Sequence, residues 1–132
     1  MKRPTATVAL VCLAAAPLAA CEAPGYASRE ITIRHSRFVP EEIRVASGSH
    51  VTFTIRNLDP IDHEFLLGDR AFQERHELGT EPHHGARPGE VSIPAGETRT
   101  TTYRFRGPGR LLMGCHLPGH WDYGMRGGVI VA

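Results

Sequence analysis

Short stretches in which apolar and polar residues alternate predict that most of this chain forms β-strands. Glu30–Arg34 alternates in this way, and Val51, Phe53 and Ile55 place their side chains on one face of a further strand. The same kind of pattern recurs in Ile43–Val45, His63–Leu67, Val91–Ile93, Thr98–Phe105, Leu111–Cys115 and Val129–Val131. Turn-forming residues separate these stretches. About seven or eight short strands with turns between them predict an all-β fold, an antiparallel β-sandwich.

Residues 68–89 interrupt this pattern with a polar, arginine-rich insert. Within the insert, Ala71–Leu78 is the one stretch with the spacing of a short helix. The insert also contains side chains that suit a second Cu(II) or Zn(II) ion, namely His76, His83 and His84 with Glu74, Glu77 and Glu81. The alternative is a solvated loop whose charges keep it soluble, and we favour that interpretation.

The first twenty residues have the features of a secretory signal peptide. Lys2 and Arg3 supply positive charge before the apolar stretch Val8–Ala20. This stretch is shorter than the ~20 residues that a membrane-spanning helix needs. We therefore expect residues 1–20 to be removed and the remaining chain to act outside the cytoplasm.

The end of this leader, Leu18-Ala19-Ala20-Cys21, resembles the lipobox of bacterial lipoproteins. In that motif the cysteine becomes the new N-terminus and carries lipid on its sulfur, so the resemblance implies that Cys21 anchors the protein to a membrane in the periplasm or at the cell surface. The alternative is ordinary cleavage, which would leave a soluble secreted protein with a free thiol. With lipid on Cys21, residues 21–29 would be a flexible tether, and a single domain would follow over residues 30–132.

Composition narrows the class of protein further. A chain of 132 residues suits one domain with its own hydrophobic core. The formal net charge of +1 argues against a nucleic-acid-binding protein, because such domains are usually strongly basic. Three cysteines cannot all be paired within the chain, and eight histidines indicate metal chemistry.

The candidate chemistry lies near the C-terminus, in a loop between two predicted strands. Cys115, His120 and Met125 follow one another with four residues between each pair. A thiolate, an imidazole and a thioether together suit copper, and a trigonal copper site needs one more imidazole. His63 is the natural candidate because it begins a predicted strand just after a turn.

This pattern, Cys115-x-x-Pro118-Gly119-His120-x-x-x-Gly124-Met125 with His63 upstream, resembles the type 1 copper signature of the cupredoxins. The spacing of the ligands is most similar to that of rusticyanin- and auracyanin-like members. The resemblance implies an eight-stranded Greek-key sandwich with one copper ion near one end, bound by His63, Cys115, His120 and Met125. The insert 68–89 departs from the compact family pattern.

A site of this kind suits one-electron transfer. Two histidines, a thiolate and a weak axial methionine are the ligand set of electron-transfer copper sites, and the sequence shows no general base or open coordination position. We therefore expect an electron carrier and not an enzyme. The alternative is a copper-binding protein for extracytoplasmic trafficking or resistance, with the histidine-rich insert as its second site.

The residues around His120 suggest how a partner would dock. Leu117, Pro118 and Trp121 would form an apolar patch that suits a transient redox protein, such as a cytochrome or an oxidase. An equally weighted alternative is that Trp121 is half-buried core. We expect a monomer that contacts the membrane through its N-terminal lipid.

Two further residues have alternative interpretations. In the cupredoxins an Asn or Ser near the first ligand often holds the ligand loops together, and Asn57 would do this here, although we favour a plain turn residue. His116 follows Cys115, and in multicopper oxidases a histidine there binds a second copper centre. That arrangement needs His-x-His pairs, which this sequence lacks, so we expect an exposed or hydrogen-bonding His116.

Overall fold

The computed structural model describes residues 25–79, 84 and 87–132. These residues form nine strands and two short helices. In chain order they are β1 (Tyr26–Ile33), β2 (Phe38–Val39), β3 (Glu42–Val45), β4 (His50–Asn57), β5 (His63–Gly68), α1 (Arg70–Glu77), β6 (Glu90–Ile93), β7 (Thr98–Arg104), β8 (Gly109–Gly114), α2 (His120–Tyr123) and β9 (Arg126–Val131).

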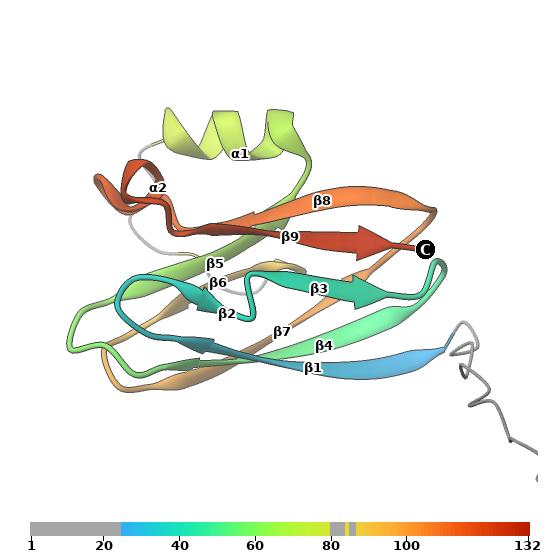
Figure 1. The fold of residues 1–132 in the computed structure, drawn as a ribbon, viewed down its shortest axis with the longest axis horizontal. Coiled ribbons are helices and arrows are strands. Elements are labelled where there is room, and N and C mark those ends of the chain that lie inside the picture. The colour runs from blue at the N-terminus through green and yellow to red at the C-terminus, as the bar shows by residue number, and fades with distance from the viewer. Residues whose placement is uncertain (1–24, 80–83, 85–86) are drawn as a thin grey trace, which may run out of the picture.

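The strands form two sheets that pack face to face (Figure 1). One sheet has the order β2-β1-β4-β7, and the other has the order β3-β9-β8-β5-β6. The predicted β-sandwich is therefore confirmed. The expectation of purely antiparallel pairing is wrong, because β1 pairs with β4 and β3 pairs with β9 in parallel. Between β1 and β4 the chain passes through β3 in the opposite sheet, and a crossover of this kind returns the strand in its original direction.

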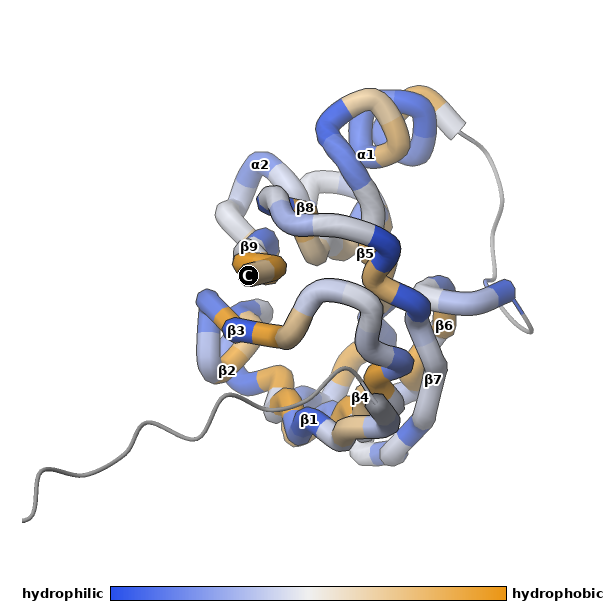
Figure 2. Tube along the Cα trace, turned by 90° about the vertical axis from the view of Figure 1, so that its right-hand side faces the viewer, coloured by the Kyte–Doolittle hydropathy of each residue, from blue (hydrophilic) through white to orange (hydrophobic). Residues whose placement is uncertain are grey.

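The hydrophobic core fills the space between the two sheets. Val51, Phe53 and Ile55 point inward from β4, as their alternation predicts, and all three are fully buried. Figure 2 views the strands nearly end on and shows hydrophobic segments in both layers, with α1 outside them beside β5 and β8. The aromatic centre is built around Phe53, whose ring centroid lies 5.3 Å from that of Phe65 and 6.3 Å from that of Phe105.

The first strand begins earlier than the sequence pattern indicates. Tyr26–Arg29, assigned above to the tether, already pair with His50–Phe53 of β4. Ala27 is small enough to pack against the core without giving a strong apolar signal, which explains why alternation alone missed these residues. The predicted signal peptide and Cys21 lie outside the described residues. Among those that are described, no helix is both long and apolar enough to cross a bilayer.

Part of the insert folds onto the outer face of the second sheet. Every residue of β5 is buried, including those on the face away from the core, because α1 packs over β5 and β8. Asp69 caps α1 by accepting a hydrogen bond from the Phe72 N–H at 2.7 Å. The amide of the buried Gln73 donates to the carbonyl oxygens of Leu66 and Leu112 at 3.0 and 2.9 Å. The helix expected over Ala71–Leu78 therefore exists one residue earlier and is anchored by a polar contact.

Replacing Phe53 with Ala should remove the centre of the aromatic cluster. We expect the free energy of unfolding to fall by about 3–5 kcal/mol, because a large cavity forms where the sheets meet. Urea denaturation of the metal-free protein measures this change. The control is Leu78→Ala, at a side chain that is 86% exposed, for which we expect a change within about 0.5 kcal/mol. Equal effects in the two variants would contradict the assigned core.

Candidate metal centre

The four predicted ligands all belong to one end of the sandwich. His63 is the first residue of β5, and Cys115 directly follows β8. His120 is the first residue of α2, and Met125 directly precedes β9. Figure 1 shows α2 at the same end as the connection between β4 and β5. Strand pairing thus brings together residues that are up to 62 positions apart in the sequence.

Three of these side chains present their donor atoms to a common point. The Cys115 sulfur lies 3.2 Å from His120 Nδ1, and the same Nδ1 lies 3.2 Å from His63 Nδ1. The three donor atoms all lie within 4.8 Å of one another, in a group that is mostly buried. Distances of this order separate ligands that share one metal ion with bonds of about 2.0–2.3 Å.

Met125, the last of the four predicted ligands, lies in the hydrophobic core. Its side chain is fully buried within the hydrophobic core cluster. Its carbonyl oxygen accepts a hydrogen bond from the Cys115 N–H at 3.1 Å, and its N–H donates to the His120 carbonyl oxygen at 2.9 Å. These bonds hold Met125 between the other two ligands of the loop.

The Cys115 thiol is fully buried, and its environment disfavours ionisation. Burial raises the pKa of Cys115 to about 12, although the N–H groups of Leu117 and Glu64 act in the opposite direction. The Glu64 N–H lies 3.3 Å from the sulfur and donates to it. Since a metal-binding cysteine binds as the thiolate, a cation must displace the proton at this position.

Asp59 orients His63 from behind. Its Oδ2 lies 2.9 Å from His63 Nε2, which leaves Nδ1 directed at the common point. The same carboxylate accepts hydrogen bonds from the His35 and Ser36 N–H groups, both at 2.7 Å. Burial would raise the pKa of Asp59, but these N–H donors and His63 outweigh burial and lower it below its ordinary value. Asp59 is therefore a fixed anion behind the ligand.

Asn57 connects two loops through its side-chain hydrogen bonds, so the expectation of a plain turn residue is wrong. Its fully buried amide donates to the carbonyl oxygens of Ile61, Ile93 and Pro94 at 2.8–3.1 Å. Its Oδ1 accepts from the Asp59 N–H at 3.0 Å. The residue joins the segment before His63 to the turn after β6, so it positions the first ligand without touching it.

A short helix controls the exposure of His120. Gly119 and Gly124 bracket α2 with φ values of 80° and 100°, a region that favours glycine. Burial, followed by the effect of nearby His63, lowers the pKa of His120, so its ring is neutral and able to bind a metal near pH 7. The ring is only partly buried, and it is the ligand of this group that reaches the surface.

Trp121 is half-buried. Its ring stacks on His116 with centroids 4.7 Å apart. Gly114 permits this packing, because a Cβ atom there would lie 2.5 Å from the Trp121 ring. His116 in turn contacts Gln73 Oε1 at 2.7 Å and the Glu77 carboxylate. His116 is thus the hydrogen-bonding residue of the two alternatives, and its ring nitrogens both have oxygen partners.

The candidate ligands of the insert are only partly brought together. His76 and His84 lie close to Glu90, a residue that the sequence analysis did not select. His83 and Glu81 lie outside the described residues. Glu77 contacts His116 instead, and Glu74 is exposed. Asp59, Glu64 and Glu90 were missed because single acidic residues near strand ends have no distinctive pattern in the sequence.

The donor set at the end of the sandwich fits copper. A thiolate and a thioether favour Cu(I), and imidazole accepts both Cu(I) and Cu(II). The His63, Cys115 and His120 donor atoms already converge without an ion, so the residues present satisfy the ligand requirement of a type 1 copper site. These three donor atoms suit one copper ion.

Comparison with known proteins gives a consistent result. The family model described as "Cupredoxin-like domain" matches residues 5–131. A curated relative from Rubrivivax gelatinosus, named "Copper-resistant cuproprotein CopI", is 37% identical over 98 residues, which cover 72% of this chain. The chain spans 59% of the length of that relative.

Solved structures of auracyanins share the fold. Auracyanin B matches with a TM-score of 0.68 at 19% identity, covering 80% of this chain and 88% of its own. Auracyanin A, a "blue" copper protein from Chloroflexus aurantiacus, matches with a TM-score of 0.65 at 24% identity, covering 81% and 99%. At these identities the likeness establishes the architecture alone.

Replacing Asp59 with Ala should weaken copper binding although Asp59 is not a ligand. We expect a loss of about 10–100-fold in affinity, because His63 loses the partner that sets its ring orientation. Competition with a chelator of known affinity measures the change. Asp62→Ala is the matched control, since its exposed carboxylate only accepts from the Ala95 N–H. An unchanged affinity in Asp59→Ala would contradict the orienting role.

Copper binding should also strengthen as pH rises. The Cys115 thiol is protonated at neutral pH because its pKa is about 12, so binding displaces one proton. Imidazoles are generally neutral above pH 7.5, and we therefore expect the Cu(I) affinity to increase about tenfold per pH unit between pH 7.5 and 9. Anaerobic competition titrations measure it. A pH-independent affinity would show that the thiol is not the displaced group.

Proposed function

This chain belongs to the cupredoxin-like domain family, and on that premise we propose that it is an extracytoplasmic electron-transfer protein with one type 1 copper. The proposed ligands are His63, Cys115, His120 and Met125. The observation that carries this proposal is the convergence of the His63, Cys115 and His120 donor atoms within 4.8 Å at one end of a rigid sandwich. A copper ion bound there would supply a one-electron couple between Cu(I) and Cu(II).

The protein contributes a site that changes little between the two oxidation states. Asp59 and Asn57 hold the segment before His63, and backbone hydrogen bonds hold the loop from Cys115 to Met125. Ligands fixed in this way need little rearrangement when one electron arrives or leaves. Met125, as a weak thioether ligand, would stabilise the reduced state relative to a harder oxygen ligand.

Burial supports electron transfer over catalysis. His63, Cys115 and Met125 are fully buried, so a substrate would have no approach to the ion from their side. His120 is the partly exposed ligand, and its ring edge offers a route for an electron but little room for a bound substrate. We therefore propose a carrier and not an enzyme.

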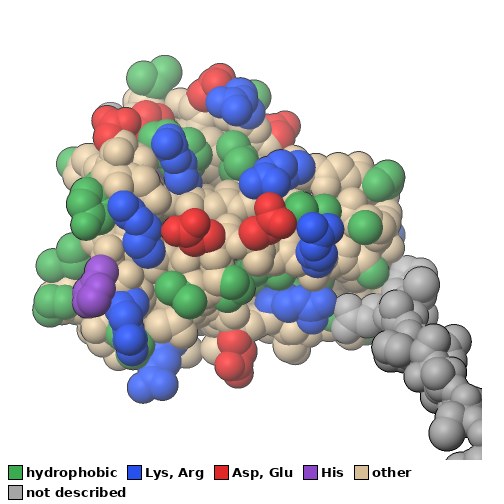
Figure 3. Space-filling model, in the orientation of Figure 1, with side chains coloured by type: hydrophobic (Ala, Val, Ile, Leu, Met, Phe, Trp, Pro, Cys, Tyr) green, Lys and Arg blue, Asp and Glu red, His purple; other side chains and the backbone are tan. Residues whose placement is uncertain are grey.

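The surface around His120 suits brief contact with another redox protein. Pro118 is exposed beside it, and Leu58 and Ile61 are 40% and 47% exposed on the loop between β4 and β5. Figure 3 shows hydrophobic side chains gathered at this end of the molecule, with arginines beside them. A small apolar area with a charged rim is typical of transient docking. We propose a cytochrome or an oxidase as the partner of a monomeric carrier.

The location of the protein is proposed from its N-terminal sequence. The signal-peptide features of residues 1–20 would direct the chain out of the cytoplasm. Lipid on Cys21 would then tether the domain to a membrane, in the periplasm or at the cell surface. Radiolabelled fatty acid incorporated into the protein, and lost in Cys21→Ala, is the expected result.

Copper resistance is the second candidate function. The relative from Rubrivivax gelatinosus is named a copper-resistant cuproprotein, and its similarity covers 72% of this chain. In this role the protein would lower the amount of reactive copper outside the cytoplasm. A deletion strain distinguishes the two functions: sensitivity to added copper with normal respiration favours resistance, and impaired respiration at low copper favours the carrier.

Replacing Cys115 with Ser should abolish the proposed type 1 centre. We expect the copper-loaded protein to absorb intensely in the visible region, because the thiolate transfers charge to Cu(II), and the variant to lose this band. The control is His50→Ala, at the opposite end of β4, which should keep it. A colourless wild-type copper complex, or a Cys115→Ser variant with the band unchanged, would overturn the proposed centre.

A further inference from the structure

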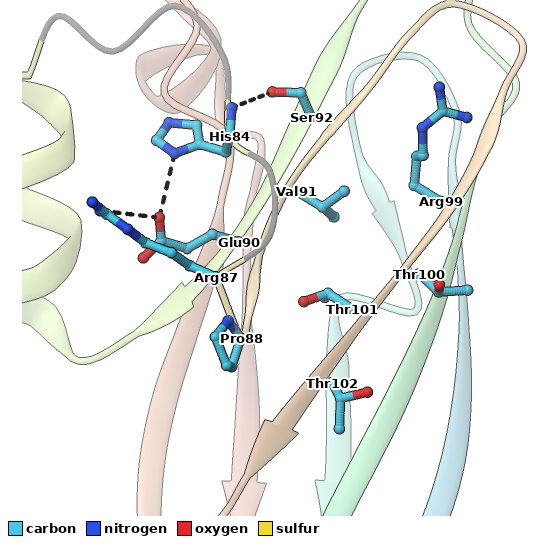
Figure 4. Close-up of a pocket in the computed structure, with 10 residues that line it drawn as sticks. All are labelled: His84, Arg87, Pro88, Glu90, Val91, Ser92, Arg99, Thr100, Thr101 and Thr102. Carbon is cyan, nitrogen blue, oxygen red and sulfur yellow. Dashed lines mark hydrogen bonds and ion pairs between the residues drawn. The ribbon is translucent and has the colours of Figure 1, made fainter.

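A second cluster of metal-binding side chains lies between the insert and the edge of the second sheet. His76 projects from α1, His84 lies in the segment before β6, and Glu90 is the first residue of β6. Their donor atoms all lie within 4.8 Å of one another. Figure 4 shows the His84 ring directed at the Glu90 carboxylate. None of these residues belongs to the type 1 centre.

The distances in this cluster are close to those of a shared ion. Glu90 Oε2 lies 3.4 Å from His84 Nδ1 and 3.8 Å from His76 Nε2. Ligands on a tetrahedral ion with bonds of about 2.0–2.1 Å are about 3.3 Å apart. An ion among these three atoms would therefore require only small side-chain movements.

On each histidine one ring nitrogen lies near a protein oxygen outside the cluster, and the other ring nitrogen faces Glu90. His76 Nδ1 lies 3.0 Å from the Phe72 carbonyl oxygen and donates to it, which leaves the lone pair on Nε2, facing Glu90. On His84 the outer nitrogen, Nε2, lies 3.5 Å from Glu64 Oε1, and Nδ1 faces Glu90. Metal-binding histidines usually have this arrangement, with a carbonyl or carboxylate behind the ring and the metal in front.

Burial makes a cation at this position favourable. The exposed fractions of His84, Glu90 and Glu64 are 8%, 9% and 2%. A cation close by would stabilise these two buried carboxylates in their charged form. Arg87 provides some, at 4.0 Å from Glu90, but its side chain is 70% exposed and free to move outward. A bound ion would neutralise Glu90 from inside the cluster.

A groove lies next to the cluster. His84 and Glu90 line one side of a groove of about 480 Å³ whose other side is formed by Arg99 and Thr100–Thr102 of β7 (Figure 4). In this view the His84 ring and the Glu90 carboxylate point away from β7, toward α1, so the groove lies beside the cluster. Two protein nitrogens and one oxygen leave a coordination position for a water.

We propose that His76, His84 and Glu90 form a second metal site that binds a divalent ion of the Cu²⁺ and Zn²⁺ class. Imidazole and carboxylate donors without sulfur suit these borderline ions, and among them Cu²⁺ binds most tightly. The site goes beyond electron transfer at the type 1 centre and stands whether or not that centre carries electrons. It would give each chain a second copper ion with ligands of a different character.

Stepwise addition of Cu²⁺ to the purified full chain tests this site. After removal of unbound ion, we expect two copper ions per chain and two distinct paramagnetic signals. One signal belongs to the thiolate centre, and the other, without intense visible absorption, belongs to the second site. Zn²⁺ added to protein with one copper should bind once, and further Cu²⁺ should displace it and restore the second copper signal, because Cu²⁺ binds such donors more tightly.

Variants locate the second ion. His84→Ala should reduce the copper content from two ions to one and should leave the visible band of the thiolate centre unchanged. Glu90→Gln, which keeps the shape of the side chain, should weaken the second ion by about 10–100-fold and serves if His84→Ala does not fold. His50→Ala is the matched histidine control, because His50 lies at the far end of β4 against Tyr26.

Two results would overturn the proposal. One is a wild-type protein that binds a single copper ion, and the other is a second ion that survives in both His84→Ala and Glu90→Gln. Loss of the visible band with the second signal intact would instead count against the type 1 centre alone. The two proposals therefore fail separately.

Discussion

The whole arrangement depends on a thiol whose burial disfavours its ionisation. Cys115 lies fully inside the core, where burial raises its pKa to about 12, and a thiolate in such a place is stable only beside a cation. The Glu64 N–H that points at the sulfur provides one dipole but no charge. This end of the sandwich is thus arranged for a positive ion, and the strands around it are arranged to keep water out.

Hydrogen bonds within the protein hold the ligands in place without a metal ion. Asn57 and Asp59 join three segments, the loop after β1, the loop before β5 and the turn after β6, with hydrogen bonds that do not involve a metal. Gly119 and Gly124, at the two ends of α2, have the backbone conformations that place His120 next to Cys115. Since the scaffold has already lost its conformational freedom on folding, binding an ion costs little further ordering.

The sequence predicted the features that depend on residues close together in the chain. Alternation located most strands, and the spacing of Cys115, His120 and Met125 indicated copper, because these ligands lie on one loop. Parallel pairing of β1 with β4 was not predictable, since it depends on where the chain crosses between sheets. The pairing of His76 with Glu90 was also hidden, because α1 folds back over β5 through Gln73, a neutral residue with no signal of its own.

Glu64 connects the two candidate metal sites through two different parts of the same residue. Its peptide N–H donates to the sulfur of Cys115, and its carboxylate lies 3.5 Å from His84 Nε2 and accepts a hydrogen bond from the His116 N–H, directly after Cys115. Almost any residue at this position would preserve the first contact, since every amino acid except proline carries that N–H. The carboxylate contacts need a side chain with an acceptor oxygen at the same reach. Because this carboxylate binds both His84 and the peptide next to Cys115, a substitution of this one side chain would disturb both sites at once, and we expect the two sites to change together over evolutionary time.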